Sequence, residues 1–380
     1  MATLLTRGRV LTEAGWRDDL DVLLDGGRIA ALTNADDARL RGADVHDLAG
    51  RLLLPGFIDI QVNGGGGVLF NDAPTVDTIR RIGAAHRQYG TTGFLPTLIS
   101  DDADVMRAAI AAVDAAITQH VPGVLGIHLE GPYIAPARRG AHDPAKFRVP
   151  GAHEIDLVCS LRQGVTVLTL APEQVSPEVV RELVARGVIV CIGHTAASYE
   201  EARAALAAGA RGFTHLYNAM SPLQGRAPGV VGAALEDRDS WCGIIVDGHH
   251  VHPAALRVAA NAKPRGKLML VTDAMPPVGA DSDTYVLAGA TITCRDGRCE
   301  TADGVLAGSA LDMAGALRNT IATLDIPLDE AARMASTYPA DFLGLARSHG
   351  RIAQGMHADL VELDDRFEVR RSWIGGAASA

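Results

Sequence analysis

The sequence predicts a (β/α)8 TIM-type barrel, an α/β fold, with a small β-sandwich domain formed by both termini. Eight short apolar runs alternate with helix-like segments through the middle of the chain, and several runs end in a histidine, a carboxylate or an amide. Eight such units over roughly 250–300 residues match the length of a (β/α)8 barrel. Shorter strand-like runs separated by Gly, Asn and Asp occupy both ends of the chain, and they indicate a separate β domain.

The first barrel strand is predicted within LLLPGFIDIQVN, residues 52–63. Its apolar residues are interrupted by Pro55-Gly56, and it ends in Gln61 and Asn63 before four consecutive glycines. A short apolar run bounded by Gly and Pro indicates a buried strand. Since active sites of parallel barrels lie at the C-terminal ends of the strands, this end is expected to carry chemistry. The later strands are predicted at 90–100, 124–132, 165–173, 188–195, 212–220, 241–251 and 268–275.

Helices are predicted between these strands. The segments 74–89 and 102–119 have helical texture, and Ser176 is expected to cap the helix that begins with PEVVRELV. Helices over 309–323 and 328–345 would close the barrel. An open doubly wound sheet is the competing arrangement, but the chain has no clean GxGxxG motif, and such a sheet would gather its ligands at one switch point.

The domain division follows from the change between short strand-like runs at both ends and alternating strands and helices in the middle. Residues 1–52 and 350–380 are assigned to the small β domain, and residues 53–349 to the barrel. The segment YVLAGATITCRDGRCETADGV, near 285–305, reads as a hairpin insertion. It is expected either to join the small β domain or to form a lobe beside the barrel.

Composition excludes several classes of partner. The chain has 380 residues, with 35 Lys and Arg against 45 Asp and Glu, and a net charge of −10. This balance argues against a nucleic acid or an anionic membrane as partner, so an anionic substrate would need a local basic cluster. There is no apolar run long enough for a membrane span and no signal-peptide core at the N-terminus. Five scattered cysteines favour the reducing cytoplasm over a disulfide framework.

Three strand ends carry side chains that bind metal ions. Glu130 lies in HLEGP, His194 in CIGHT and His215 in THLYN. Two imidazoles and one carboxylate with one open position form a donor set typical of catalytic zinc. The open position would hold a water whose pKa the cation lowers to about 7. Asp273, at the end of a fourth strand, is expected to take the proton of this water and give it to a leaving group.

The other histidines divide into two groups. His128 lies two residues before Glu130 and therefore points to the same face of the strand. We expect it to support the ligands from beneath, and the alternative is that it is an extra ligand. The remaining histidines of the helices, loops and tail are interpreted as structural or solvent-facing: His86, His120, His153, His349 and His357.

Two loops are predicted to contact the substrate. In RRGAHDP, His142 lies in a loop after the Glu130 strand, where a fixed imidazole can polarise a carbonyl group. The loop HLYNAMSPLQGRAPG carries Asn218 and Arg226, and an Arg in a glycine-flanked turn suits a phosphate or carboxylate. The segment DGHHVHP adds histidines at 249, 250 and 252, for which a solvated loop or adventitious metal binding is the alternative interpretation.

Together these motifs resemble those of the N-acetylglucosamine-6-phosphate deacetylases, a family of the amidohydrolase superfamily. The resemblance covers nearly the whole chain, and although each motif alone is weak, the ordered set is highly specific. The motifs are PGFIDIQVNGGGGVLFND (55–72), FLPTLI (94–99), GIHLEGPY (126–133), GAHDP (140–144), TLAPE (169–173), GHT (193–195), THLYNAM (214–220), GRAPG (225–229), GIIVDGHHV (243–251), LVTDAM (270–275) and LAGSAL (306–311).

The resemblance implies roles for individual residues. It implies that Glu130, His194 and His215 bind one divalent metal ion per subunit, zinc or iron, both of which suit nitrogen and oxygen donors. It implies Asp273 as the catalytic acid and base, and His142 as the residue that polarises the acetamide carbonyl. It also implies the same fold, a (β/α)8 barrel with a small β domain from both termini.

The substrate contacts implied by the resemblance lie on the later loops. Arg226, Asn218 with the backbone of Ala219, and His250 match contacts to the sugar phosphate. In the family, the residue at the position of His250 reaches the neighbouring subunit's site, which implies a homodimer.

This chain departs from many amidohydrolases at the first strand. Those proteins carry His-x-His at its end, where this chain has Gln61 and Asn63, which are included among the substrate-binding candidates. The departure is characteristic of one branch of the deacetylases and implies that one half of a two-metal site is missing. Weak binding of a second ion through Gln61 stays an open alternative.

The implied reaction is hydrolysis of N-acetyl-D-glucosamine 6-phosphate to D-glucosamine 6-phosphate and acetate, in amino-sugar catabolism and cell-wall recycling. A second hypothesis is an amidohydrolase for another amide, such as an N-acyl amino acid or a cyclic ureide, for which Arg226 and His250 would be unimportant. A third is a barrel scaffold that has lost catalysis. Retention of all three metal-binding candidates and of Asp273 counts against the third hypothesis.

Overall fold

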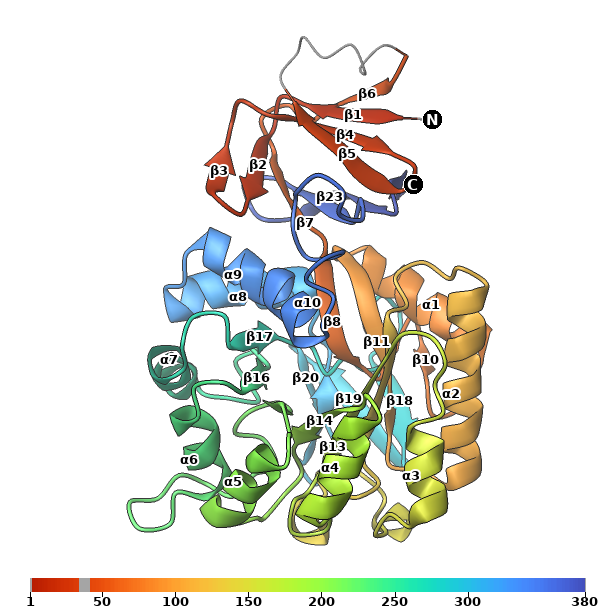
Figure 1. Ribbon diagram of the computed structural model, residues 1–380, viewed down its shortest axis with the longest axis vertical. Helices are drawn as coiled ribbons and strands as arrows, with labels where there is room; N and C mark the ends of the chain where they lie inside the picture. The colour runs from red at the N-terminus through yellow and green to blue at the C-terminus, as the bar shows by residue number, and fades with distance from the viewer. Residues whose placement is uncertain (1, 34–41, 380) are drawn as a thin grey trace.

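The computed structural model consists of a closed barrel with a small β lobe at one end (Figure 1). It describes residues 2–33 and 42–379. Part of the predicted N-terminal β segment, residues 34–41, lies outside the described residues. Both chain termini lie in the β lobe, and the chain enters the barrel through β8 (Figure 1).

The barrel sheet contains eight parallel strands that are neighbours in chain order. A parallel bridge between Val62 and Ala274 joins the first strand to the segment after the last and closes the barrel. This arrangement confirms the predicted (β/α)8 fold and excludes the open doubly wound sheet. The strands are β8 (Phe57–Val62), β11 (Thr91–Ile99), β12 (Gly126–Glu130), β13 (Val165–Leu170), β14 (Ile189–Ile192), β15 (Gly212–Phe213), β16 (Trp241–Ile244) and β17 (Leu268–Leu270).

The predicted first strand is two strands joined at Gly56. Its first part, β7 (Leu52–Pro55), pairs with lobe strands β2 (Arg9–Thr12) and β22 (Leu360–Leu363), and its second part is β8. A Cβ at Gly56 would lie 2.0 Å from Oγ1 of Thr92, so only glycine fits at this joint. The predicted domain boundary after residue 52 falls inside β7. The division into two domains at 52/53 and 349/350 stays a prediction.

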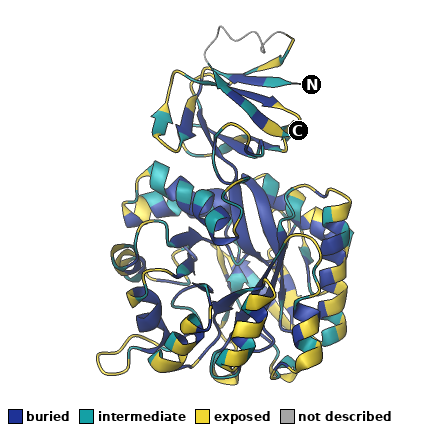
Figure 2. Cartoon of the chain, viewed as in Figure 1, coloured by how far each residue is buried: buried dark blue, intermediate teal, exposed yellow. Residues whose placement is uncertain are grey.

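Helices surround the barrel with their apolar faces turned inward, so that buried residues fill the interior and exposed ones face outward (Figure 2). Ser176 occupies the predicted N-cap position, but its side chain makes no capping hydrogen bond. The longer helices are α1 (Val76–Arg87), α2 (Ala103–Thr118), α4 (Pro177–Ala185), α5 (Tyr199–Ala207), α6 (Gly229–Glu236), α7 (Pro253–Ala262) and α8 (Met313–Leu324), with the shorter α3 at Ala152–Val158.

The helix predicted over 328–345 is in fact two helices, α9 (Leu328–Ala335) and α10 (Thr337–Phe342). The break is at Ser336, whose φ of −139° and ψ of −65° are not helical. Pro339 lies in the first turn of α10, where its missing N–H costs nothing, whereas in a continuous helix it would remove a hydrogen bond.

The β lobe contains two sheets with their own apolar core, which includes Leu5, Ile29, Leu53 and Trp373. One sheet has the order β5-β4-β1-β6, and the other has the order β24-β23-β22-β7-β2-β3, so strands from both termini contribute. The lobe strands are β1 (Thr3–Thr6), β2 (Arg9–Thr12), β3 (Gly15–Arg17), β4 (Asp21–Asp25), β5 (Arg28–Thr33), β6 (Asp44–Asp47), β22 (Leu360–Leu363), β23 (Val369–Ile374) and β24 (Ala377–Ala378).

The insertion predicted near 285–305 is a four-stranded antiparallel sheet, here called the insertion sheet. Its register brings Cys294 opposite Cys299, and these two cysteines form a disulfide. The expectation of a chain without disulfides is therefore wrong at this pair, whereas Cys159, Cys191 and Cys242 are free. The strands are β18 (Thr284–Leu287), β19 (Ala290–Arg295), β20 (Arg298–Glu300) and β21 (Leu306–Ser309).

Two short strands, β9 (Gly64–Gly65) and β10 (Val68–Leu69), form a small ribbon in the loop after β8. His86 of α1 bonds the carbonyl oxygen of Gly64 through Nε2 at 2.9 Å, which fixes this ribbon against the helix. Among the described residues, no helix is long and apolar enough to cross a membrane.

Candidate active site

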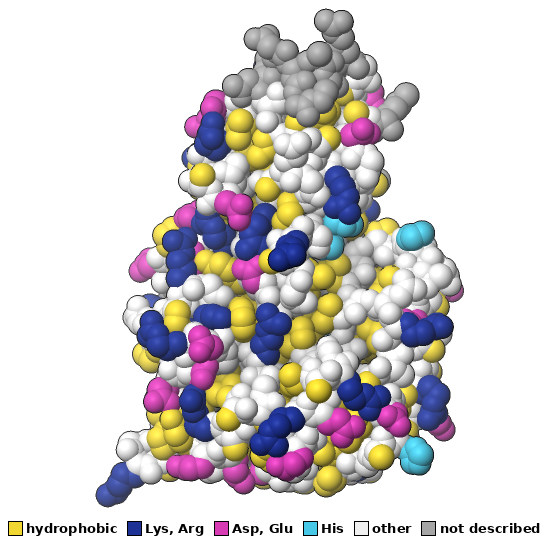
Figure 3. Space-filling view, viewed as in Figure 1, with side chains coloured by type: hydrophobic (Ala, Val, Ile, Leu, Met, Phe, Trp, Pro, Cys, Tyr) yellow, Lys and Arg dark blue, Asp and Glu magenta, His cyan; other side chains and the backbone are white. Residues whose placement is uncertain are grey.

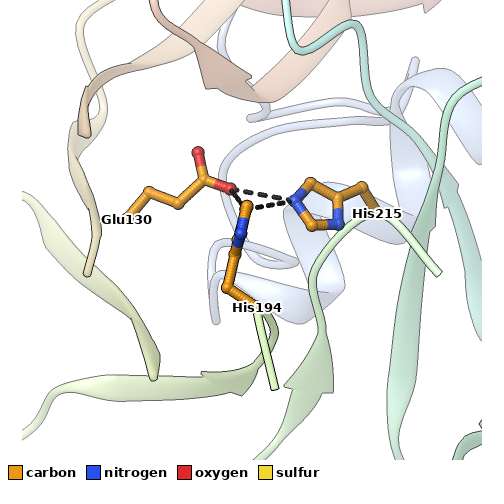
Figure 4. Close-up of side chains that lie close together, drawn as sticks. All are labelled: Glu130, His194 and His215. Carbon is orange, nitrogen blue, oxygen red and sulfur yellow. Dashed lines mark hydrogen bonds and ion pairs between the residues drawn. The ribbon is translucent and has the colours of Figure 1, made fainter. Parts of the chain in front are cut away.

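Glu130, His194 and His215 converge at the C-terminal ends of their strands (Figure 4). Oε1 of Glu130 lies 3.1 Å from Nε2 of His194 and 3.0 Å from Nε2 of His215. The two imidazole Nε2 atoms are 2.9 Å apart. All three side chains are buried. The structure therefore brings together the three residues that the sequence predicts as metal ligands.

The hydrogen bonds around this triad fit a divalent cation. Nδ1 of His194 lies 2.9 Å from the carbonyl oxygen of Arg138, so this nitrogen must donate, and the lone pair of Nε2 faces Glu130. Nδ1 of His215 is buried without a partner among the described residues, so its Nε2 is the atom directed at the others. Burial opposes the ionisation of Glu130, but the neighbouring His194 and His215 hold the pKa of its carboxyl group well below the usual range. An ionised carboxylate and two imidazoles at this spacing are a donor set suited to zinc.

Three of the strand-end residues have a left-handed backbone. The φ angles are +47° at His194, +32° at His215 and +53° at Asp273. Each such conformation costs about 1–3 kcal/mol in a residue other than glycine and persists only where the surrounding structure enforces it. Here the turn at each strand end directs the side chain into the centre of the barrel mouth.

Asp273 lies beside the triad and is held by two amide side chains. Its Oδ1 accepts hydrogen bonds from Nδ2 of Asn63 at 2.6 Å and Nε2 of Gln61 at 3.2 Å. Loss of solvent and the negative charge of Glu130 raise the pKa of Asp273 above its usual value. Gln61 also donates to Oε1 of Glu130 at 3.1 Å, so its amide group links the two carboxylates.

A buried carboxyl group that sequence reasoning missed supports this arrangement. Asp59 lies two residues before Gln61 in β8, and its Oδ1 accepts the backbone N–H of Gln61 and of Thr272, while Oδ2 accepts the hydroxyl of Thr272. Burial raises the pKa of Asp59 to about 7. It ties the end of β8 to the residue before Asp273, and its two-residue spacing from Gln61 was the available sequence signal.

His142 reaches the site from the loop after β12. Nδ1 of its ring lies 3.4 Å from the backbone N–H of Ser100 and 2.8 Å from the Ser100 hydroxyl. Because the backbone N–H can only donate, Nδ1 accepts and the ring proton belongs to Nε2. Burial, followed by the neighbouring His194, lowers the pKa of His142 to about 3, so the ring is neutral at ordinary pH. Its ring centroid is 4.5 Å from that of His194.

A cavity of about 490 Å³ opens over these residues, a size suited to a small-molecule ligand. The insertion sheet contributes Arg298 and Leu306 to its wall. Two of the eleven predicted site residues lie elsewhere: Gln61 lies beneath the cavity, and Arg226 lies in an exposed loop outside it. The nine in its wall are Asn63, Glu130, His142, His194, His215, Asn218, Ala219, His250 and Asp273.

The three histidines of DGHHVHP have different environments. His250 lines the cavity of its own chain, and its Nδ1 lies 2.6 Å from Oδ2 of Asp247. Nε2 of His249 bonds the carbonyl oxygen of Asp296 at 3.0 Å and so joins this loop to the tip of the insertion sheet. His252 caps α7. The expectation that His250 reaches a neighbouring subunit's site stays a prediction.

His128 is not part of the converging set. Its Nε2 bonds the Thr169 hydroxyl at 2.7 Å, and Thr169 in turn bonds Thr214 at 2.7 Å, which forms a buried polar layer under the triad. Burial lowers the pKa of His128 to about 4. The favoured expectation, support from beneath rather than ligation, agrees with this geometry.

Other functional candidates escaped sequence reasoning because they act through backbone atoms or across long separations. The carbonyl group of Arg138 orients His194, and Arg298, which is paired with Glu300, lies in the cavity wall. Of these further candidates, only Asp247 could have been found from the sequence, because it lies three residues before His250.

On the face shown in Figure 3, acidic and basic side chains are interspersed over the surface.

Comparison with known proteins agrees with this geometry. The family model described as the amidohydrolase family matches residues 52–378. An N-acetylgalactosamine-6-phosphate deacetylase from Shewanella sp. (strain ANA-3) is 45% identical over 371 residues, 97% of this chain and 93% of that protein. A Homo sapiens N-acetylglucosamine-6-phosphate deacetylase is 38% identical over 98% of this chain and 93% of that protein.

A crystal structure of the N-acetylglucosamine-6-phosphate deacetylase from Pasteurella multocida superposes with a TM-score of 0.96. It is 35% identical in sequence, and the match covers 100% of both chains. The chain described here therefore belongs to the amidohydrolase family, and within it to the group of N-acetylglucosamine- and N-acetylgalactosamine-6-phosphate deacetylases.

Proposed function

We propose that this chain hydrolyses the acetamide group of N-acetyl-D-glucosamine 6-phosphate, releasing D-glucosamine 6-phosphate and acetate, in amino-sugar catabolism and cell-wall recycling. The observation that carries the proposal is the convergence of Glu130, His194 and His215 in the wall of one cavity that also holds Asp273. Membership of the amidohydrolase family and the names of the relatives support the reaction class.

The triad would hold one divalent cation per subunit in this cavity, with zinc as the first choice and iron as the second, since nitrogen and oxygen donors suit both. When bound, the cation supplies a water of lowered pKa and polarises the amide carbonyl. The amide N–H groups of Gln61 point at the same carboxylates, which argues for one cation rather than two.

The chain's own residues then move the protons. Asp273 accepts the proton of the attacking water, whose oxygen bonds to the acetyl carbon. The carbonyl π electrons move onto oxygen, which accepts a hydrogen bond from Nε2–H of His142. As the carbon–oxygen double bond re-forms, the carbon–nitrogen bond breaks and Asp273 gives its proton to the departing amine. The raised pKa of Asp273 suits a group that must both take and return a proton.

The sugar phosphate would be held by polar groups of the cavity wall that take no part in the proton transfers. Asn218, the backbone of Ala219 and His250 lie in the wall and offer polar contacts. Oδ1 of Asn63 is buried and has no partner among the described residues, so it can accept a hydrogen bond from the substrate. Binding energy from these remote contacts positions the amide for attack.

The enzyme is further proposed to be a homodimer. Arg226 lies in an exposed loop outside its own chain's cavity, so it is the candidate that a partner subunit would contribute to the phosphate site. Because a charged sugar phosphate does not cross a bilayer unaided, we place the reaction in the cytoplasm.

A subunit-mixing experiment tests the dimer. Arg226→Ala and Asp273→Asn subunits, each inactive alone, are co-expressed with different tags, and the hybrid is purified. If Arg226 acts across the interface, the Arg226→Ala subunit receives the arginine of its partner and the hybrid regains activity. A dimer whose hybrid stays inactive would place Arg226 in its own subunit's site, and a monomer in solution would contradict the proposal.

The epimeric substrate, N-acetyl-D-galactosamine 6-phosphate, is a second candidate. It is favoured by the Shewanella relative, which is 45% identical and named for that sugar. The two substrates differ only at the 4-hydroxyl group, and the metal, acid–base and phosphate contacts proposed above would be the same for both.

Acetate release decides between these proposals. The assay compares both N-acetylhexosamine 6-phosphates with unphosphorylated N-acetylglucosamine, and the metal content is measured on the same sample. A strong preference for a phosphorylated sugar supports the substrate class, and the ratio of the two kcat/KM values selects the epimer. Equal or absent activity on all three would contradict the proposal and favour another amide, such as an N-acyl amino acid or a cyclic ureide.

A further inference from the structure

Three metal-binding side chains gather far from the active site, where the chain leaves the barrel and returns to the β lobe. His349 follows α10, and His357 and Asp359 immediately precede β22. This crossing segment is the dark blue connection between α10 and the lobe in Figure 1. Sequence reasoning assigned both histidines structural or solvent-facing roles. We call the three residues the seam cluster.

The donor atoms of the seam cluster lie close together. The histidine rings are stacked, with centroids 4.4 Å apart and an interplanar angle of 16°. Nε2 of His349 lies 3.7 Å from Oδ2 of Asp359, which is too long for a hydrogen bond. One ligand atom from each residue lies within 4.8 Å of the other two. A cation between them would therefore need only small side-chain rotations.

Other polar atoms of Asp359 and His349 already form hydrogen bonds. These bonds orient the atoms that remain free to bind a cation. Oδ1 of Asp359 accepts the backbone N–H of Gly375 at 2.7 Å, leaving Oδ2 toward His349. Nδ1 of His349 bonds the Ser348 hydroxyl at 2.8 Å, leaving Nε2 toward Asp359. Neither ring nitrogen of His357 has a hydrogen-bond partner among the described residues. Fixing one nitrogen of an imidazole by an outer hydrogen bond is how metal-binding histidines are usually oriented.

The backbone holds these residues in place. The N–H of His357 donates to the carbonyl of Ser348 at 2.8 Å, and the carbonyl of Asp359 accepts from Gly56, the joint between the lobe and barrel strands, at 2.9 Å. Two cations lie nearby: Arg28 is bonded to the carbonyl of Gly355, and Arg87, which faces Asp359, is bonded to Ser372 and to the carbonyl of Ala377. All three residues are half-buried, so the cluster is open to an ion from solvent.

We propose that the seam cluster binds a second divalent cation of the zinc class, separate from the active-site cation. Two imidazoles and one carboxylate supply the donors, and water completes the coordination. The cation would join the end of the barrel to the β lobe and stabilise the crossing segment between 349 and 359. Because the site contains no substrate-binding residue, its loss should leave turnover unchanged.

Metal stoichiometry tests the proposal on the full-length protein. Chelator-stripped samples are titrated with zinc alone by calorimetry, and metal content is measured after dialysis. We expect two zinc ions per chain in the unmodified protein, one in His357→Ala, one in His194→Ala, and none in the double variant. His153→Ala, at an exposed position of α3, is the matched control and should bind two. His357→Ala loaded with one equivalent should keep the turnover of the unmodified protein.

Two results would overturn the proposal. One is a single zinc ion per chain that His194→Ala removes and His357→Ala does not. The other is a second zinc ion that survives both His357→Ala and His349→Gln, or that binds only at millimolar zinc, which would mark adventitious binding. If His357→Ala does not fold, as judged by circular dichroism, His349→Gln decides alone, because the glutamine keeps the size of the side chain.

Discussion

At the scale of single residues, one backbone contact determines which ring nitrogen carries the proton in His194 and in His142. The carbonyl of Arg138 forces the proton of His194 onto Nδ1, whereas the N–H of Ser100 forces that of His142 onto Nε2. The first ring therefore presents a lone pair to the triad, and the second presents a donor to the cavity. Two identical side chains thus acquire opposite roles from main-chain groups that have no sequence signature.

Asp273→Asn should reduce kcat by about 10²- to 10⁴-fold, the range typical for loss of a general acid–base group. An asparagine can still accept the hydrogen bond from Asn63, so the fold and the bound metal should be retained. Steady-state kinetics and metal analysis on one sample check this. Asp281→Asn, at an exposed position, is the control and should be fully active. Near-normal kcat in Asp273→Asn would show that another group is the base.

His142→Ala should lower kcat by about 10²- to 10³-fold with little change in KM, because a neutral donor to the developing oxyanion acts mainly in the transition state. The pKa of about 3 keeps this ring neutral across the assay range, so its own titration should not appear in the pH–rate profile. An equal rise in KM with kcat preserved would instead assign His142 to ground-state binding.

At the scale of elements, the joint between β7 and β8 lets one chain segment serve two sheets. The apolar run 52–60 correctly predicts extended backbone. Hydrophobic periodicity and composition do not show which sheet each half of the run joins. The partners decide this, because β7 pairs with β2 and β22, whereas β8 pairs with β11.

Gly56→Ala should destabilise the protein by about 1–3 kcal/mol, the usual cost of overpacking a filled site. The added Cβ would lie 2.0 Å from Oγ1 of Thr92, so the strands must separate. Urea denaturation measures the loss. In Gly225→Ala the new methyl group meets nothing within 4 Å, so its free energy of unfolding should match the unmodified protein. A stable Gly56→Ala would mean that Thr92 moves aside without cost.

The contact between α1 and the ribbon after β8 makes stability depend on pH. Burial lowers the pKa of His86 to about 4, against 6.5 for an exposed imidazole. Between these values the unfolded chain binds a proton that the folded chain does not, so stability falls as pH decreases from 6.5 toward 4. The loss from this group reaches about 3 kcal/mol at the lower end.

His86→Gln should weaken this dependence, because an amide keeps a donor for the Gly64 carbonyl and does not titrate. The measurement compares urea unfolding of both proteins at pH 7 and pH 4.5. The free energy of unfolding of His86→Gln minus that of the unmodified protein should be larger at pH 4.5 than at pH 7. Parallel losses in both proteins would show that His86 does not contribute.

At the scale of the whole molecule, bound cations should couple the active site to global stability. A ligand that binds only the folded state at about 100 times its Kd adds about 2.7 kcal/mol. In His357→Ala, which lacks the seam cluster, zinc should therefore raise the Tm of the stripped protein by several degrees. The rise should disappear when His194→Ala is added. A Tm of His357→Ala that does not change when zinc is added would contradict metal binding by Glu130, His194 and His215.

Local sequence patterns were enough to identify the (β/α)8 class, the eight strands and most of the candidate site. They were enough because barrel strands place their C-terminal residues at one mouth, so Glu130, His194, His215 and Asp273 had to meet once the strands were recognised. The same local patterns missed the break at Ser336.

Other contacts could be assigned only from the folded structure. It paired Cys294 with Cys299, brought Arg298 to the cavity, turned His250 toward its own chain's site and left Arg226 outside it. It also brought together the seam cluster, which lies in a C-terminal segment whose sequence indicates only a loop. Local periodicity encodes which face of an element is buried, whereas these contacts depend on the three-dimensional paths of strands and loops, which hydrophobic periodicity does not encode.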